Sequence, residues 1–199
     1  VVSLAKQDFQ IPRRGDLPAL SHYGKLNASP TTQVVAGYTE ASRGCKHTCL
    51  HCPVVPVYKG KFRIVQRDVV MADIRNQVAL GARHITFGDP DFFNGPGHAM
   101  ALVREVAQEF PGLTYDVTIK VEHLLGHADL LPTLVATGCA FVTTAVEAVD
   151  DDILAILDKG HSVEDFHRAV AMAKGLGLVL APTFVPFTPD SPFSRFTVL

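Results

Sequence analysis

The sequence lacks the long apolar stretch of a membrane protein, since no uninterrupted apolar run in its 199 residues approaches the roughly 18 to 20 residues that a span needs. The N-terminus also lacks the charged-then-apolar pattern of a secretory signal. The 18 lysines and arginines are scattered, and the formal net charge is -2, so no basic surface for nucleic acid stands out. These absences argue against a membrane or secreted protein, and we expect a cytoplasmic one.

Cysteine is scarce, and its placement argues against a disulfide-stapled secreted domain. The chain has 4 cysteines, and Cys45, Cys49 and Cys52 stand close together instead of in evenly spread pairs. Clustered thiols in a reducing compartment are typical of metal binding. The fourth, Cys139, lies in an apolar stretch, and we expect it in the core because free cysteine is among the most buried residue types.

The composition predicts one domain, because an apolar content of 47% is enough to bury one sizeable core. Residues 1–33 are polar and contain three prolines, which predicts an extended lead-in without regular elements. Residues 34–199 are expected to form the domain itself. The chain begins at Val1 without an initiator methionine and stops at Leu199 after a strand and a proline-rich loop, which suggests a fragment.

From Val34 onwards, short β-rich runs alternate with helical patterns, which is typical of βα units and a parallel sheet. Strands are predicted at residues 34–39, 84–87, 114–121, 140–146 and 178–185. Helices are predicted at residues 67–80, 102–110, 128–136, 150–157 and 163–173. Right-handed crossovers of this kind build either an open doubly wound sheet or a curved barrel, and the spacing alone does not choose between them.

The most informative segment is the loop after the first predicted strand, where the three clustered cysteines form a Cys-x3-Cys-x2-Cys pattern. Thiolates are the usual ligands of iron-sulfur clusters, and a compact loop can hold three corners of a cubic cluster while the fourth iron stays open. Two alternatives remain at this point. His47 or His51 could complete a structural zinc site, and a distant fourth cysteine, Cys139, could complete an electron-transfer ferredoxin site.

The pattern resembles the hallmark of the radical S-adenosylmethionine (SAM) superfamily, which is Cys-x3-Cys-x-aromatic-Cys after the first strand of a partial (β/α)6 barrel. The spacing matches fully, while His51 takes the place of the usual aromatic residue. The resemblance implies an α/β fold with parallel strands, a partial (β/α)6 barrel that is incomplete at the C-terminus. It also implies a [4Fe-4S] cluster on Cys45, Cys49 and Cys52.

The same resemblance implies an enzyme that reductively cleaves SAM to a 5'-deoxyadenosyl radical, which abstracts hydrogen from an unknown substrate. An electron donor such as a flavodoxin or ferredoxin is implied as a partner. The residues that the resemblance places near SAM are His51, Gly88, Asp89, Lys120, Glu122, Glu147 and Thr183. Lys120 and Glu122 are expected on a polar face of the third strand, and Glu147 at the end of the fourth. No catalytic residue toward the substrate is predicted.

Three segments, residues 41–47, 84–92 and 183–189, are similar to the subgroup of radical SAM proteins with a C-terminal CUAEP or CCAEP tail, which this chain lacks. The Lys159-Gly160-His161 turn is expected as a marker of the fold. Two other functions stay open. One is a radical SAM methylthiotransferase or methyltransferase acting on RNA, and the other is a non-catalytic binding module braced by a metal.

Overall fold

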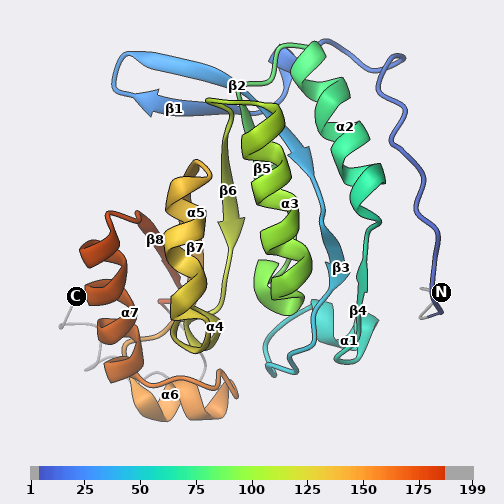
Figure 1. Ribbon diagram of the computed structural model, residues 1–199. Coiled ribbons are helices and arrows are strands. Elements are labelled where there is room, and N and C mark those ends of the chain that lie inside the picture. Colours follow the sequence, from blue (N-terminus) through green and yellow to red (C-terminus); the bar gives the residue numbers. More distant parts are fainter. Residues whose placement is uncertain (1–4, 187–199) are drawn as a thin grey trace.

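A six-stranded sheet with the order β1-β2-β5-β6-β7-β8 is the frame of the computed structural model, which describes residues 5–186 (Figure 1). Its strands are β1 (Lys25–Ser29), β2 (Thr32–Thr39), β5 (His84–Phe87), β6 (Thr114–Thr118), β7 (Cys139–Glu147) and β8 (Leu180–Phe184). The strands from β2 to β8 run parallel, and β1 pairs with β2 in the antiparallel sense. The sheet curls into a half-barrel, which confirms the predicted α/β partial barrel.

Helices cover one face of this sheet, and α2, α3, α5 and α7 lie side by side in front of it in Figure 1. The helices are α1 (Val54–Tyr58), α2 (Arg67–Ala79), α3 (Pro96–Glu109), α4 (Val121–Gly126), α5 (Leu131–Ala136), α6 (Asp151–Ile156) and α7 (Val163–Leu176). Between sheet and helices lies one large apolar core, to which β5 and β6 contribute Ile85, Phe87, Tyr115 and Val117. Cys139 packs against this core, as expected.

The helix ends follow local signals in the sequence. Ser162 caps α7 with a reciprocal capping box, in which the Ser162 side chain and Asp165 satisfy each other's backbone amides. Gly177 ends the same helix in the left-handed region, with φ 69°. Asp150 caps α6 by accepting hydrogen bonds from the amides of Asp152 and Ile153. These caps fix the ends of the two helices in the connection between β7 and β8.

The third predicted strand is too long. Strand β6 ends at Thr118, and α4 begins at Val121, so Lys120 and Glu122 do not lie on a strand. Val121 and Leu124 are fully buried three residues apart, which is helical spacing. The apolar and β-branched residues around them also fit a strand, and the strand was therefore predicted too long. The predicted helix at residues 128–136 is a 3₁₀ turn (Ala128–Leu130) followed by α5.

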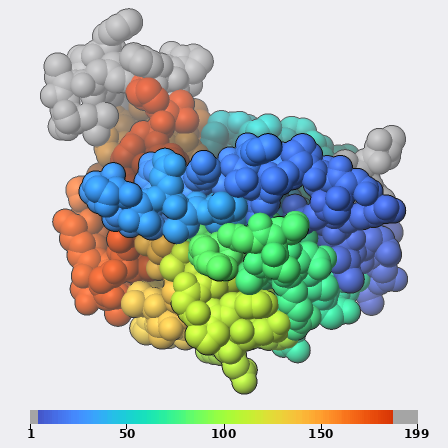
Figure 2. Space-filling model, turned by 90° about the horizontal axis from the view of Figure 1, so that it is seen from above, coloured from blue at the N-terminus to red at the C-terminus, as the bar shows by residue number. Residues whose placement is uncertain are grey.

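The predicted lead-in is wrong in one respect, because residues 25–29 form β1 and extend the sheet. Arg14 anchors the segment before it by pairing with both carboxylate oxygens of the buried Asp73 on α2, at 2.6 and 2.8 Å. Figure 2 shows this segment and the β1–β2 hairpin lying across the end of the molecule where the parallel strands begin. The N-terminal segment therefore covers the amino end of the half-barrel.

A second, two-stranded sheet pairs β3 (Ser42–Gly44) with β4 (Phe62–Ile64) in the antiparallel sense. The hairpin encloses the three-cysteine loop and α1, at the opposite end of the molecule from β1 (Figure 1). Among the described residues, no helix is long and apolar enough to cross a membrane. Residues 187–189 of the third segment that resembles the tail-bearing subgroup lie outside the described part of the chain.

Candidate cofactor site

A cavity lies where the cysteine loop meets the carboxyl ends of the parallel strands, which is where ligands bind in folds of this kind. The residues that line it are Cys45, His47, Cys49, His51, Cys52, Val55, Pro90, Lys120, Ala145, Glu147 and Lys159. The cavity thus combines three thiols with two lysines and one carboxylate. The lining residues come from the cysteine loop and α1, the loop after β5, the start of α4, the end of β7 and the turn after α6.

Glycine at position 44 determines how the chain enters the cysteine loop. Gly44 has φ 84°, and a Cβ atom there would lie 2.5 Å from the carbonyl oxygen of Lys61. Just before it, Asp89 accepts hydrogen bonds from the amide of Ala41 at 2.9 Å and from the Ser42 hydroxyl at 2.6 Å. Cys45 therefore leaves β3 in a direction fixed by backbone conformation and by a buried carboxylate.

Two distant residues hold the loop itself. Asn94 accepts a hydrogen bond from the amide of Lys46 at 3.1 Å and donates to the carbonyl oxygen of Gly44 at 3.3 Å. The amide of Leu50 donates to the carbonyl oxygen of Leu157, at 3.0 Å, in the turn after α6. The loop is tied in this way to two other βα connections of the half-barrel, and its thiols are held at the cavity.

The three loop thiols are free and suited to a metal cluster. Cys45 and Cys49 are buried and Cys52 is half-buried. Burial raises the pKa of the Cys45 thiol above its ordinary value, so its thiolate needs a cation beside it, which the iron of a cluster would supply. Cys139 does not line the cavity, and burial raises its pKa to about 12. The residues present therefore fit a cluster held by three thiolates, with no fourth cysteine at the cavity.

Glu147 joins the cysteine loop to the far wall of the cavity. Its Oε1 atom lies 2.9 Å from Nε2 of His51 and 3.2 Å from Nζ of Lys159, and both contacts have hydrogen-bond geometry. Glu147 has φ 71°, a left-handed conformation that costs a residue with a side chain about 1–3 kcal/mol. Its other oxygen, Oε2, makes no hydrogen bond within residues 5–186 and stays available to a ligand.

Lys120 reaches the cavity from the residue before α4, and its Nζ atom lies 3.2 Å from Oε2 of Glu122. Glu122 itself does not line the cavity, and its side chain is 47% exposed. The same Oε2 atom would be 2.8 Å from a Cβ atom at Gly160, which has φ 74°. The Lys159-Gly160 turn is therefore closely fitted against the start of α4.

The structure brings together some of the predicted SAM residues and separates others. His51, Lys120 and Glu147 line the cavity with the three cysteines, whereas Gly88, Asp89, Glu122 and Thr183 do not. Asp89 holds the strand before the loop, and burial raises its pKa to about 6. A Cβ atom at Gly88 would overlap the Tyr38 hydroxyl. Thr183 is exposed on β8.

Lys159 is the functional candidate that sequence reasoning missed, because the Lys-Gly-His turn indicates only a feature of the fold. Its side chain is 3% exposed, which is rare for lysine and requires the pairing with Glu147. Pro90 and Ala145 also line the cavity without having been predicted there, and so does His47, which the sequence suggested only as a zinc ligand. The signal for Lys159 was its place in the connection that follows a strand ending in a carboxylate, 12 residues after Glu147.

Fold and site together define an α/β half-barrel with a three-thiol loop at its carboxyl edge. The sequence profile of the Radical SAM superfamily matches residues 39–193. The chain therefore belongs to the radical SAM superfamily, whose enzymes bind a [4Fe-4S] cluster and SAM. The match begins at the last residue of β2 and includes the cysteine loop.

Curated relatives are similar over most of this chain but are much longer. The chain is 27% identical over 170 residues to a tRNA-2-methylthio-N(6)-dimethylallyladenosine synthase of Sphingopyxis alaskensis, covering 78% of this chain and 37% of that protein. It is 26% identical over 133 residues to a bacteriochlorophyllide d C-12(1)-methyltransferase of Chlorobaculum tepidum, covering 65% and 28%. The chain thus spans little more than a third of these relatives at most.

Solved structures support the fold. The radical SAM methyltransferase TsrM from Kitasatospora setae matches with a TM-score of 0.71 and 19% identity, over 94% of this chain and 36% of that one. The cobalamin-dependent radical SAM enzyme OxsB matches with a TM-score of 0.69 and 16% identity, over 80% and 25%. At these identities the likeness concerns the arrangement of strands and helices.

Proposed function

We propose that this protein is a radical SAM enzyme in which Cys45, Cys49 and Cys52 hold a [4Fe-4S] cluster. The observation that carries this proposal is the joint lining of one cavity by three free thiols and the Glu147 carboxylate. When bound, cluster and SAM supply a reductive cleavage of the sulfonium, and the 5'-deoxyadenosyl radical so formed abstracts hydrogen from the substrate.

The residues around the thiols suit the charged methionyl end of SAM. The free Oε2 atom of Glu147 accepts a hydrogen bond from the ammonium group, because a carboxylate pairs best with a charged donor. Lys120 donates to the carboxylate group from the other wall of the cavity. Lys159 and His51 occupy the remaining oxygen of Glu147 and so hold the carboxylate in place.

A reconstitution experiment tests the proposal. Anaerobic treatment with iron and sulfide should give a brown protein with about four irons per chain and SAM-dependent changes in the electron paramagnetic resonance spectrum. Cys49→Ala should abolish the cluster and SAM cleavage while the barrel stays folded. Cys139→Ala is the matched control and should keep both. A colourless protein with stoichiometric zinc would contradict the proposal, and unfolding of the Cys49→Ala variant would favour a metal-braced binding module.

The subgroup, the electron donor and the location of the protein are further proposals. We place the protein in the subgroup with a CUAEP or CCAEP tail, supported by the similarity of residues 41–47 and 84–92. A cysteine or selenocysteine encoded after Leu199 is the test. We further propose a flavodoxin or ferredoxin as electron donor and the cytoplasm as location, because the loop thiols need a reducing compartment.

A second candidate is a methylthiotransferase or methyltransferase acting on RNA, which is favoured by the name of the Sphingopyxis alaskensis relative. The products of SAM distinguish the two functions. Methyl transfer leaves S-adenosylhomocysteine, whereas hydrogen abstraction alone leaves methionine and 5'-deoxyadenosine. Chromatography of single-turnover mixtures measures both. The scattered positive charge argues against a nucleic-acid substrate.

A further inference from the structure

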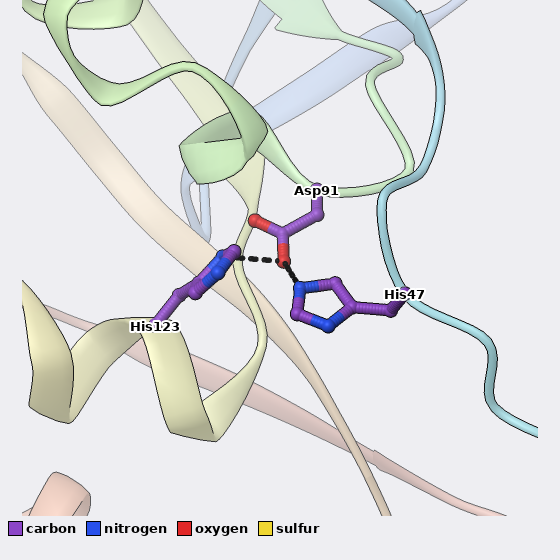
Figure 3. A group of neighbouring side chains, drawn as sticks. All are labelled: His47, Asp91 and His123. Atoms are coloured by element: carbon purple, nitrogen blue, oxygen red, sulfur yellow. Dashed lines mark ion pairs between the residues drawn. The ribbon is translucent and has the colours of Figure 1, made fainter. Parts of the chain in front are cut away.

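Three side chains from three different segments converge beside the cysteine loop (Figure 3). His47 belongs to the loop, Asp91 follows β5, and His123 lies on α4. Their nearest atoms are Nε2 of His47, Oδ2 of Asp91 and Nδ1 of His123, which all lie within 4.8 Å of one another. Oδ2 of Asp91 is 3.5 Å from the His47 nitrogen and 2.8 Å from the His123 nitrogen. We call these three residues the His-Asp-His cluster.

The His-Asp-His cluster is closed to solvent. The side chain of Asp91 is 0% exposed, that of His123 is 7% exposed and that of His47 is 14% exposed. All three converging atoms are buried, and their mutual contacts are ion pairs that do not meet the geometry of a hydrogen bond, so none of the three has a hydrogen-bond partner among the described residues. Leaving a buried polar group without a partner costs about 1–3 kcal/mol, and more for a charged group. Three such atoms at one point require an explanation.

The carboxylate is fixed in place. Oδ1 of Asp91 accepts a hydrogen bond from the amide of Phe93 at 3.0 Å, which orients Oδ2 toward the two imidazoles. Oδ2 therefore lies between two ring nitrogens, and each nitrogen offers a lone pair to a cation when it carries no proton.

This donor set is that of a metal site. Neutral imidazole nitrogen and carboxylate oxygen are common ligands of zinc and of divalent iron, and sites with two histidines and one carboxylate occur for both ions. A divalent cation would satisfy all three converging atoms at once. We propose that His47, Asp91 and His123 bind a divalent transition-metal ion, with a set of ligands that includes none of the three loop cysteines. The proposal does not depend on the proposed function, since it uses none of the cysteines.

The position of the site gives the ion a structural role. It would join the cysteine loop to the loop after β5 and to α4. The three side chains themselves form no hydrogen bond that links these segments. Further groups near the site are Glu122, whose Oε2 atom is 3.9 Å from Nδ1 of His47, the His127 ring, 5.7 Å from that of His123, and the Cys45 thiol, which interacts electrostatically with Asp91. The ion would thus hold the middle of the cysteine loop independently of any cluster.

The test removes the competing thiols first. The variant Cys45→Ala, Cys49→Ala, Cys52→Ala keeps Cys139 and is called thiol-free because its loop has no thiol. Zinc titration of this variant by calorimetry and metal analysis should give one bound ion per chain. Cobalt added instead should show weak visible bands without the strong thiolate-to-cobalt absorption. Adding His123→Ala or Asp91→Ala should abolish binding. His127→Ala is the matched control, since this neighbouring histidine is outside the His-Asp-His cluster, and it should bind zinc as before.

Two results would overturn the proposal: no stoichiometric zinc in the thiol-free variant, or binding that survives His123→Ala. Loss of binding in His127→Ala would also overturn the assignment of ligands. Circular dichroism and thermal unfolding show whether each variant is folded. His123→Gln is a second, milder substitution at the same ligand. Zinc should raise the melting temperature of the thiol-free variant and leave that of its His123→Gln derivative unchanged. Iron reconstitution of the native chain tests the proposed function separately.

Discussion

His47 and His51 lie in the same short loop, yet they meet different surroundings. His51 shares the Glu147 oxygen with Lys159 through well-directed hydrogen bonds, and its side chain is 28% exposed at the cavity. His47 faces Asp91 at 3.5 Å without a hydrogen bond and is only 14% exposed. Each histidine thus meets a carboxylate at or after the end of a strand, but only the His51 contact has the geometry of a hydrogen bond.

The difference indicates two kinds of binding. A satisfied carboxylate with one free oxygen, at an open cavity, can exchange a ligand in every catalytic cycle. A buried set of atoms that lack hydrogen-bond partners suits an ion that stays bound. One loop of a half-barrel can therefore contribute His51 to a cofactor site and His47 to a metal site.

Alanine at each histidine provides the sharpest test of this comparison. In the thiol-free variant, His47→Ala should raise the zinc dissociation constant by more than about 100-fold, since even outer-shell partners of a metal are worth about 10- to 100-fold. His51→Ala should leave it unchanged. Calorimetric titration measures both. Equal effects of the two substitutions would remove the distinction between the two sides of the loop.

The next largest effect concerns the entry to the loop. Gly44→Ala should lower the free energy of unfolding by at least about 2 kcal/mol, because alanine is strained at φ 84° and its Cβ atom would meet the Lys61 carbonyl. Urea denaturation measures this. Gly126→Ala is the control at the end of α4, with nothing within 4 Å, and should be neutral or slightly stabilising. Equal stabilities would show that loop entry needs no glycine.

Glu147→Gln should weaken SAM binding about tenfold, or about 1.4 kcal/mol, because the amide loses the charge that pairs with the ammonium group. Equilibrium dialysis with reconstituted protein measures the dissociation constant, and the iron content should not change. Glu164→Gln, on the exposed start of α7, is the matched control and should bind SAM normally. Unchanged SAM binding by Glu147→Gln would contradict the proposed role of Glu147 in binding SAM.

The smallest effect is expected for His51→Phe, which restores the aromatic residue usual in the superfamily. The cluster should form normally, and the SAM dissociation constant should change by less than about threefold. Lys159 still bonds Glu147 in this variant, so the carboxylate keeps one of its partners. Iron analysis and SAM titration check the result. Loss of the cluster would show that His51 supports the thiols instead of the cofactor.

The sequence predicts the parts of this molecule that depend on local pattern. The five parallel strands and the cysteine loop follow from apolar runs, glycines and thiol spacing, and each strand exists in the predicted region, although β6 and β8 are shorter than predicted. Strand β1 was missed because residues 25–29 are polar and gain their place only by pairing with β2. The end of β6 was placed too late because Val121 suits either a strand or a helix.

The cofactor site could be predicted only in part, because some of its contacts join segments that are far apart in the sequence. Glu147 ends a buried strand, so its position alone suggested a role, and it lines the cavity. Asp89 has the same acidic character, but its contacts with Ala41 and Ser42 come from another part of the chain. The meeting of His47 with Asp91 and His123 joins three segments, and no spacing along one sequence reports such a meeting.

The hydrogen bond between Leu50 and Leu157 also has a consequence for biosynthesis. A ribosome adds about 5–20 residues per second, so the loop thiols leave it roughly 5–20 seconds before the segment that fixes their loop. During that interval the nascent chain carries reactive, unscreened thiols. Oxygen or stray metal ions would reach them most easily then, and delivery of iron and sulfide is best timed after synthesis of the turn at Leu157.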